Sequence, residues 1–94
     1  MDQIIDTLDK QKDFLRRTYK VSSIGIFGSY VRAENKKASD VDLLVEFYEP
    51  IGFFKFTELE EILGKLLEKK VDLVTKKALK PVIRDEILQE VVYV

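Results

Sequence analysis

The sequence predicts a small α/β domain, equally describable as α+β, with a mixed three-stranded sheet covered by helices. Short apolar segments typical of strands alternate along the chain with segments whose apolar residues recur at helical spacing. Hydrophobic residues make up 46% of the 94 positions, which is enough for one core. The two prolines and four glycines fall at element boundaries, and no repeat or linker divides the chain. We therefore expect a single domain over residues 1–94.

In the first half of the chain we expect a helix, a strand and a helical turn. The segment Asp2–Tyr19 has the one-sided apolar pattern of an amphipathic helix. The apolar run Ser23–Gly28 is too short for a helix and predicts a buried strand. A helical turn is expected over Tyr30–Asn35, followed by a polar connection over residues 36–39. The apolar side of the first helix consists of Ile4, Ile5, Leu8 and Leu15.

The second half predicts two strands and two helices. Apolar and polar residues alternate over most of Asp40–Phe47, as in a strand, and Val71–Thr75 is a third strand. A last helix is expected over Leu79–Val91, with Pro81 tolerated in its first turn. The helix between these strands has a core-facing stripe of Leu59, Ile62, Leu63, Leu66 and Leu67. The expected buried side of the last helix is Val82, Ile83, Ile87 and Val91.

Composition excludes several kinds of site. The chain has no histidine and no cysteine, so Ser-His and Cys-His nucleophilic sites, disulfides, and thiolate or imidazole metal sites are excluded. The formal charge of −1 argues against bulk binding of nucleic acid, which depends on a surplus of Lys and Arg. Any catalysis must use carboxylates, Lys, Arg, hydroxyls and hard metal ions.

No membrane segment or signal peptide is apparent. A membrane span needs a run of about 18 apolar residues, and the sequence has none. The N-terminus lacks the basic start and apolar stretch of a signal peptide. We expect a cytoplasmic protein.

Asp40 and Asp42 form a pair of carboxylates that can converge on one site. They lie two apart on a strand, so they project from one face with their Cα atoms about 6.5 to 7 Å apart. Carboxylates side by side repel unless a cation lies between them, and oxygen ligands select a hard ion such as Mg²⁺. The alternative is structural: Asp40 caps the entry of the strand, and Asp42 is solvated on an open sheet face.

Asp72 is a third acid, inside an apolar strand, where an unpaired buried charge is costly. It needs a partner or a cation. The alternative is a strand-end residue in contact with water or with a neighbouring Lys69 or Lys70.

Gly28 and Ser29 close the first strand. Free backbone N–H groups, a hydroxyl and a glycine that permits close approach suit phosphate oxygens, although most Gly-Ser pairs are simply turns. Arg32 either reaches the same anion or pairs with Glu34 or another surface acid.

The combination of Gly28–Arg32, Ser39–Val45 and a later strand with Asp72 resembles the minimal nucleotidyltransferases. These are the small, MntA-type (MNT) antitoxin branch of the DNA polymerase β-like nucleotidyltransferase superfamily, often encoded beside HEPN-domain toxins. One departure is Ala33, where such proteins commonly carry glycine. The resemblance covers essentially the whole chain, including the 50–53 loop, the 70–74 strand and the 92–94 ending.

The resemblance implies a role for each motif residue. It places the nucleoside triphosphate against Gly28 and Ser29, with Arg32 reaching the same phosphates. It places metal ions on Asp40 and Asp42, with Asp72 as a third carboxylate that shares a metal and helps to deprotonate the acceptor hydroxyl. Two Mg²⁺ ions about 3.5 to 4 Å apart would stabilise both the attacking and the leaving oxygen of an in-line displacement.

The resemblance also implies a function. Such proteins transfer AMP from ATP to a hydroxyl, here expected to be a tyrosine, on a partner HEPN toxin, which blocks its ribonuclease action. Because the chain ends about one helix after Asp72, we expect the partner to supply most of the acceptor site. A non-catalytic antitoxin that neutralises by binding is the alternative, against which the intact set of three acids speaks. Transfer to a small molecule such as an aminoglycoside is a third reading, and the short chain argues against it.

Two apolar segments suggest contact surfaces. Five of the ten aromatic residues lie within Phe47–Phe56, where they form either an interface or a cap on the core. The tail Val91–Val94 either pairs as an edge strand, docks on another subunit, which leaves an oligomer open, or packs on its own core. Basic residues around the Asp72 strand and the last helix are interpreted as solvated faces: Lys69, Lys70, Lys76, Lys77, Lys80 and Arg84.

Overall fold

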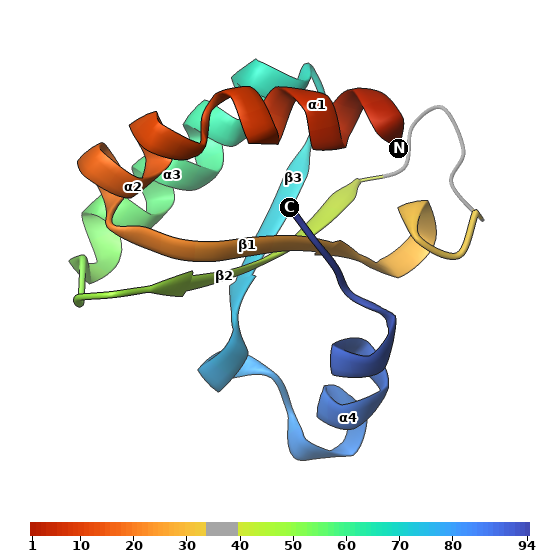
Figure 1. The fold of residues 1–94 in the computed structure, drawn as a ribbon. Coiled ribbons are helices and arrows are strands. Elements are labelled where there is room, and N and C mark those ends of the chain that lie inside the picture. Colours follow the sequence, from red (N-terminus) through yellow and green to blue (C-terminus); the bar gives the residue numbers. More distant parts are fainter. Residues whose placement is uncertain (34–39) are drawn as a thin grey trace.

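The computed structural model describes residues 1–33 and 40–94. These residues form a four-stranded sheet in the order β3-β2-β1-β4, with helices on both faces (Figure 1). The elements are α1 (Asp2–Lys10), α2 (Lys12–Tyr19), β1 (Val21–Phe27), the 3₁₀ helix η1 (Gly28–Tyr30), β2 (Val41–Phe47), α3 (Gly52–Leu67), β3 (Val71–Thr75), the 3₁₀ helix η2 (Lys76–Ala78), α4 (Pro81–Glu90) and β4 (Val92–Tyr93).

The expected first helix is present as two helices. Gln11, with φ −100° and ψ 5°, separates α1 from α2. The amide of Gln11 is shared between the carbonyls of Thr7 and Leu8, so the chain turns without losing a hydrogen bond. Both helices still bury the same side, which consists of Ile4, Leu8, Leu15 and Tyr19.

The sheet is mixed, as expected, and has one strand more than predicted. β1 runs antiparallel to β2, and β2 runs parallel to β3. The additional strand is β4, in which Tyr93 pairs with Gly25 and Val92 pairs with Ile26. The edge-strand interpretation of the tail is thereby confirmed, and so is packing on its own core, since Val94 lies against the main core and Val91 against the smaller cluster on the other face. Gly25 permits this pairing, because a Cβ there would come within 2.6 Å of the Val91 side chain.

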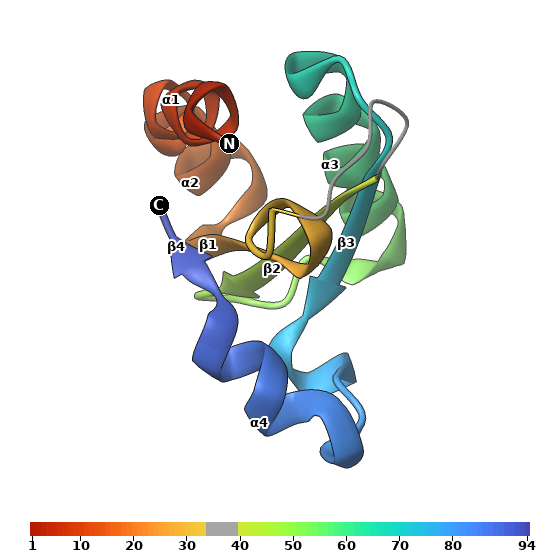
Figure 2. The same ribbon diagram turned by 90° about the vertical axis from the view of Figure 1, so that its right-hand side faces the viewer.

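Most of the core lies on one face of the sheet, beneath α1, α2 and α3 (Figure 2). Fully buried residues of this main core include Leu8, Ile26, Leu43 and Leu63. The opposite face carries a smaller cluster of three buried residues beneath α4. These are Phe27, Leu44 and Leu79, against which Val74, Ile87, Leu88 and Val91 pack.

The expected buried side of the last helix is partly wrong. Val82 is 92% exposed and Ile83 is 43% exposed, whereas Ile87 and Val91 pack on the small cluster, together with Leu88. The reason is the path of the chain: α4 starts beyond the sheet and runs back toward it, so its C-terminal half makes the contacts (Figures 1 and 2). Pro81 lies in the first turn, as predicted.

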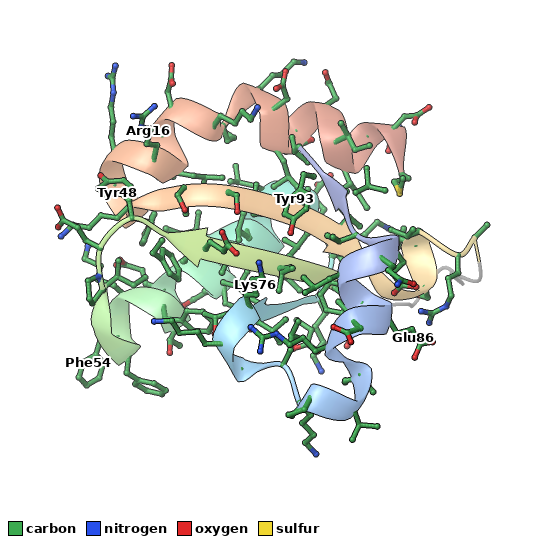
Figure 3. The ribbon with its side chains drawn as sticks, turned by 60° about the horizontal axis from the view of Figure 1, so that its bottom comes forward. Arg16, Tyr48, Phe54, Lys76, Glu86 and Tyr93 are labelled. Carbon is green, nitrogen blue, oxygen red and sulfur yellow. The ribbon has the colours of Figure 1, made fainter. Side chains whose placement is uncertain are left out.

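Some aromatic residues of Phe47–Phe56 pack on the core, and others are exposed and remain available for an interface. Phe47 and Phe56 pack edge to face, 6.2 Å between ring centroids, and lie against the main core. Phe53 and Phe54 are 76% and 88% exposed, at the start of α3. Figure 3 shows Phe54 directed away from the body of the domain. The core therefore accounts for part of the aromatic segment.

The outer edge of β3 is partly covered by α3. Glu60 of α3 accepts a hydrogen bond of 3.0 Å from the backbone N–H of Leu73. No helix in the described ranges is both long and apolar enough to cross a membrane. The predicted 36–39 connection, and the end of the predicted 30–35 turn, lie outside the described residues.

Candidate active site

Three segments distant in sequence meet where β1 ends and where β2 and β3 begin. In the sheet register, Asp42 lies opposite Phe27 on one side and opposite Asp72 on the other. Neighbouring strands are about 4.8 Å apart, and residues in register project from the same face. Asp40 precedes β2 and lies two residues from Asp42, hence on the same side. The structure thus brings the three predicted acids together on the face that α4 covers.

The proximity of these acids changes the ionisation of Asp42. Partial burial raises the pKa of the Asp42 carboxyl above its ordinary value, and the negative charges of Asp72 and Asp40 raise it further. Arg32 acts in the opposite direction, whereas Glu90 adds to the increase in this pKa. Asp42 is half-buried, which disfavours the alternative of a solvated residue on an open sheet face.

The three acids are not a ready-made metal cage. Within residues 1–33 and 40–94, no group of three acidic side chains is arranged to hold a metal ion by itself. The donor set nevertheless fits Mg²⁺, which is bound through one or two carboxylates and takes its other oxygens from water and substrate phosphates. Asp72 is exposed and forms no ion pair with Lys69 or Lys70 in the described part of the chain. Lys69 instead lies over the ring of Tyr30, 5.9 Å from its centroid.

Gly28 has two independent reasons to be glycine. Its φ is +77°, in the left-handed region that side-chain-bearing residues rarely adopt. A Cβ at this position would also overlap the carboxylate of Asp42. The Gly28 carbonyl accepts hydrogen bonds from the amides of Val31 and Arg32, both at 3.1 Å, which closes the turn. The turn therefore brings the end of β1 directly against Asp42.

Ser29 follows in η1 and is half-buried. In the described ranges its hydroxyl has no hydrogen-bond partner. Ser39 of the motif, and Glu34, the predicted ion-pair partner of Arg32, lie outside the described residues.

Glu90 is a site residue that the sequence did not indicate. Its Oε1 accepts a 2.9 Å hydrogen bond from the backbone N–H of Gly28. Nη1 of Arg32 donates to both carboxylate oxygens, at 3.1 and 3.2 Å. Of the two alternatives for Arg32, the structure shows pairing with an acid, and the partner is 58 residues away. Glu90 reaches Gly28 and Arg32 because α4 returns toward the sheet, and a contact over 58 to 62 residues leaves no local pattern in the sequence.

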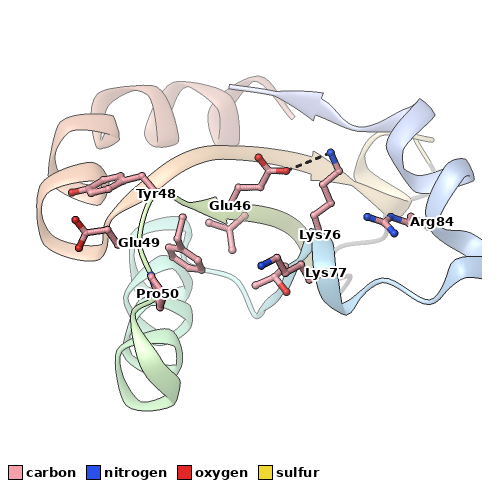
Figure 4. Close-up of a pocket in the computed structure, with 10 residues that line it drawn as sticks. Glu46, Tyr48, Glu49, Pro50, Lys76, Lys77 and Arg84 are labelled. Carbon is pink, nitrogen blue, oxygen red and sulfur yellow. Dashed lines mark ion pairs between the residues drawn. The ribbon is translucent and has the colours of Figure 1, made fainter.

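A separate cavity of about 570 Å³ lies at the other end of β2 (Figure 4). It is lined by the 45–50 segment, by residues 75–77 at the end of β3 and in η2, and by Arg84 of α4. Lys76 pairs there with Glu46 at 3.6 Å. None of the three acids lines this cavity, so it is distinct from the candidate active site.

Comparison with known proteins identifies the family. The profile of the nucleotidyltransferase domain family matches residues 8–94. The chain belongs to this family. The resemblance stated from the motif residues is therefore confirmed.

Two archaeal relatives match this nucleotidyltransferase over its whole length. Protein adenylyltransferase MntA of Thermococcus cleftensis is 50% identical over 94 residues, which cover 100% of this chain and 95% of the relative. A Methanocaldococcus jannaschii relative that also bears a protein adenylyltransferase name is 50% identical over 95 residues, 100% of this chain and 97% of its own. This nucleotidyltransferase is therefore similar to named protein adenylyltransferases over the whole of the sequence given.

Solved structures have the same fold. A minimal nucleotidyltransferase is 30% identical, with a TM-score of 0.75, and the match covers 97% of this chain and 88% of that one. A toxin-antitoxin structure with AMP-PNP matches at 24% identity and a TM-score of 0.72, covering 89% and 69%. A complex of a tri-AMPylated Shewanella oneidensis HEPN toxin with its MNT antitoxin matches at 24% and 0.68, covering 99% and 71%. The last two matches establish the shared fold.

Proposed function

We propose that this nucleotidyltransferase transfers AMP from ATP to a hydroxyl group, that of a tyrosine, on a partner HEPN ribonuclease toxin, and so acts as its antitoxin. The observation that carries the proposal is the in-register pairing of Asp42 with Asp72 beside the Gly28 turn. The 50% identity with an MntA protein adenylyltransferase over the full length supports the same activity. The proposal includes a cytoplasmic location, because the proposed reaction consumes ATP.

Each site residue has a part in this reaction. Asp40 and Asp42 would hold Mg²⁺, and Asp72 would share it. When bound there, the ion would supply positive charge that offsets the crowded carboxylates and the charge developing on the phosphates. The Ser29 hydroxyl and the Arg32 guanidinium bind phosphate oxygens, since charge-assisted hydrogen bonds of this kind are the strong ones. Because Gly28 has no side chain, the Asp42 carboxylate and the phosphates can both lie against its backbone.

In the proposed transfer step, one bond to the α-phosphorus forms as another breaks, and Asp72 takes up the released proton. The acceptor hydroxyl oxygen forms a bond to the α-phosphorus of ATP, and the bond between that phosphorus and the bridging oxygen of the leaving pyrophosphate breaks. The hydroxyl proton passes to Asp72, whose exposed carboxylate an incoming side chain can reach. The products are an AMP-modified hydroxyl and pyrophosphate.

The test uses purified protein, a HEPN partner, Mg²⁺ and ATP labelled on the α-phosphate. We expect label on the partner, at a tyrosine identified by mass spectrometry, and its loss in the double variant Asp40→Ala, Asp42→Ala. Removing metal-holding carboxylates typically lowers such rates by roughly 10³-fold or more. The matched control is Asp85→Ala, an exposed acid of α4 away from the three acids, which should retain wild-type labelling.

A stable complex without label would contradict catalysis and identify a binding antitoxin. Chelation of Mg²⁺ separates these outcomes further, since it should abolish labelling and leave complex formation intact.

A further inference from the structure

Glu90 holds two groups of the candidate nucleotide site together. Its carboxylate accepts from the Gly28 N–H at 2.9 Å and from Arg32 Nη1 at 3.1 and 3.2 Å. The side chain of Glu90 is 19% exposed, and that of Arg32 is 49% exposed. One carboxylate thus joins the turn after β1 to the arginine that follows it.

The place of Glu90 in its own helix is unfavourable. It is the last residue of α4, and a negative charge there faces the negative end of the helix dipole. It also adds negative charge to a site that already holds Asp40, Asp42 and Asp72. The hydrogen bonds to Gly28 and Arg32 are the local interactions that offset these costs, so the helix itself does not account for a glutamate here.

The backbone of Glu90 is fixed from the C-terminal side. Val91 follows, with its amide bonded to the Ile87 carbonyl at 3.0 Å, and β4 then pairs with β1 at Gly25 and Ile26. The amide of Val94 donates to the carbonyl of Ile24, also at 3.0 Å. Because the helix end is attached to the same strand that leads into the Gly28 turn, the backbone of Glu90 is held beside that turn.

We propose that Glu90 is a positioning residue for the nucleotide: it fixes the Gly28 turn and orients the guanidinium of Arg32 toward the triphosphate. This inference rests on the proposed function. Both contacts from Arg32 to Glu90 are made by Nη1, one of the three guanidinium nitrogens. These contacts hold one nitrogen of Arg32 beside the Gly28 turn, and so keep the planar guanidinium, which binds anions through paired N–H groups, next to the proposed phosphate position.

The test compares variants by their affinity for Mg²⁺ with AMP-PNP, measured by calorimetry, and by KM and kcat for ATP. We expect Glu90→Ala to weaken binding and to raise KM about tenfold, equivalent to about 1.4 kcal/mol, while kcat falls less. Glu90→Gln keeps an acceptor oxygen for the Gly28 N–H and should recover most of the affinity. The control is Glu86→Ala, one turn earlier on α4 and exposed, which should bind as the wild type does (Figure 3).

A double-mutant cycle with Arg32→Ala tests whether the two side chains act together. If Glu90 acts through Arg32, the double variant should bind little worse than Arg32→Ala alone. Additive losses would overturn that route. Thermal unfolding of each variant checks the fold. If Glu90→Ala does not fold, Glu90→Asp takes its place with the same expected loss of binding, because its carboxylate is one methylene too short to reach both Gly28 and Arg32.

The opposite result would identify a different role. Tighter binding in folded Glu90→Ala would show that the carboxylate competes with phosphate, and unchanged binding would show that it only stabilises the fold; either overturns positioning. Nucleotide binding is measured without an acceptor. Binding without AMP transfer would therefore contradict the proposed function alone, and failure of the wild type to bind any nucleotide would contradict both proposals.

Discussion

The two faces of the sheet differ in what they bury and in what they do. Among the described residues, the face under α1, α2 and α3 contributes sixteen buried apolar residues to one cluster, and the face under α4 contributes three. The three acids and the Gly28 turn lie on the second face. Stability is thus concentrated on one side of the strands, and the polar, self-repelling groups that chemistry requires are placed on the other.

The largest loss of stability is expected on the face of the sheet under α1, α2 and α3. Leu63→Ala removes a fully buried side chain of α3 from the main core and should lower the free energy of unfolding by about 2–5 kcal/mol. Leu79→Ala, in the three-residue cluster, should cost less because fewer neighbours surround it. Urea unfolding of both variants makes the comparison. Equal losses would mean that the two faces contribute alike.

A smaller effect on stability is expected from charge on the face of the sheet under α4. The raised pKa of Asp42 means that its ionised form is less favourable in the folded than in the unfolded chain. This penalty is absent at low pH and appears as pH rises from the ordinary carboxyl value of 3.8 through the raised folded value. Metal-free Asp42→Asn should therefore be more stable than the wild type at pH 7.

The measurement is a pair of unfolding curves for Asp42→Asn and the wild type in chelator, at pH 7 and below pH 3.8. The difference in stability should vanish at the lower pH. If Asp42→Asn were the less stable protein at pH 7, the carboxylate would be stabilised by a partner and our account of its pKa would be wrong.

The smallest effect is expected at the start of α4. Val82 is 92% exposed, so Val82→Ser should change the free energy of unfolding by no more than about 0.5 kcal/mol. A loss well above that amount would mean that Val82 is covered in solution, and that the packing under α4 extends along the whole helix.

Local patterns predicted most of the fold and the residues that meet at the site. The alternation over 40–47 and the apolar run over 71–75 correspond to β2 and β3, and their pairing brings Asp42 and Asp72 together. Gly28 was identified from its place at the end of a strand. The structure adds the reason: a left-handed φ and the space taken by Asp42.

What the sequence could not predict depends on distant parts of the chain. The two-residue β4 is too short to have a period, and it forms because Gly25 leaves room beside β1. The side of α4 that packs depends on where the helix meets the sheet, so Val82 and Ile83 satisfied helical spacing and are nevertheless exposed. Glu90 meets Gly28 across 62 residues, for the same reason.

The outer strands of the sheet also bear on how copies of this protein behave at high concentration. Unpaired backbone groups on an edge strand are a template for another chain, and aggregation often starts there. On β3 the amide of Leu73 is already bonded to Glu60, and on the other edge β4 has only two residues. The bond from Leu73 to Glu60 and the short length of β4 both disfavour strand-to-strand stacking between copies of the protein at high concentration.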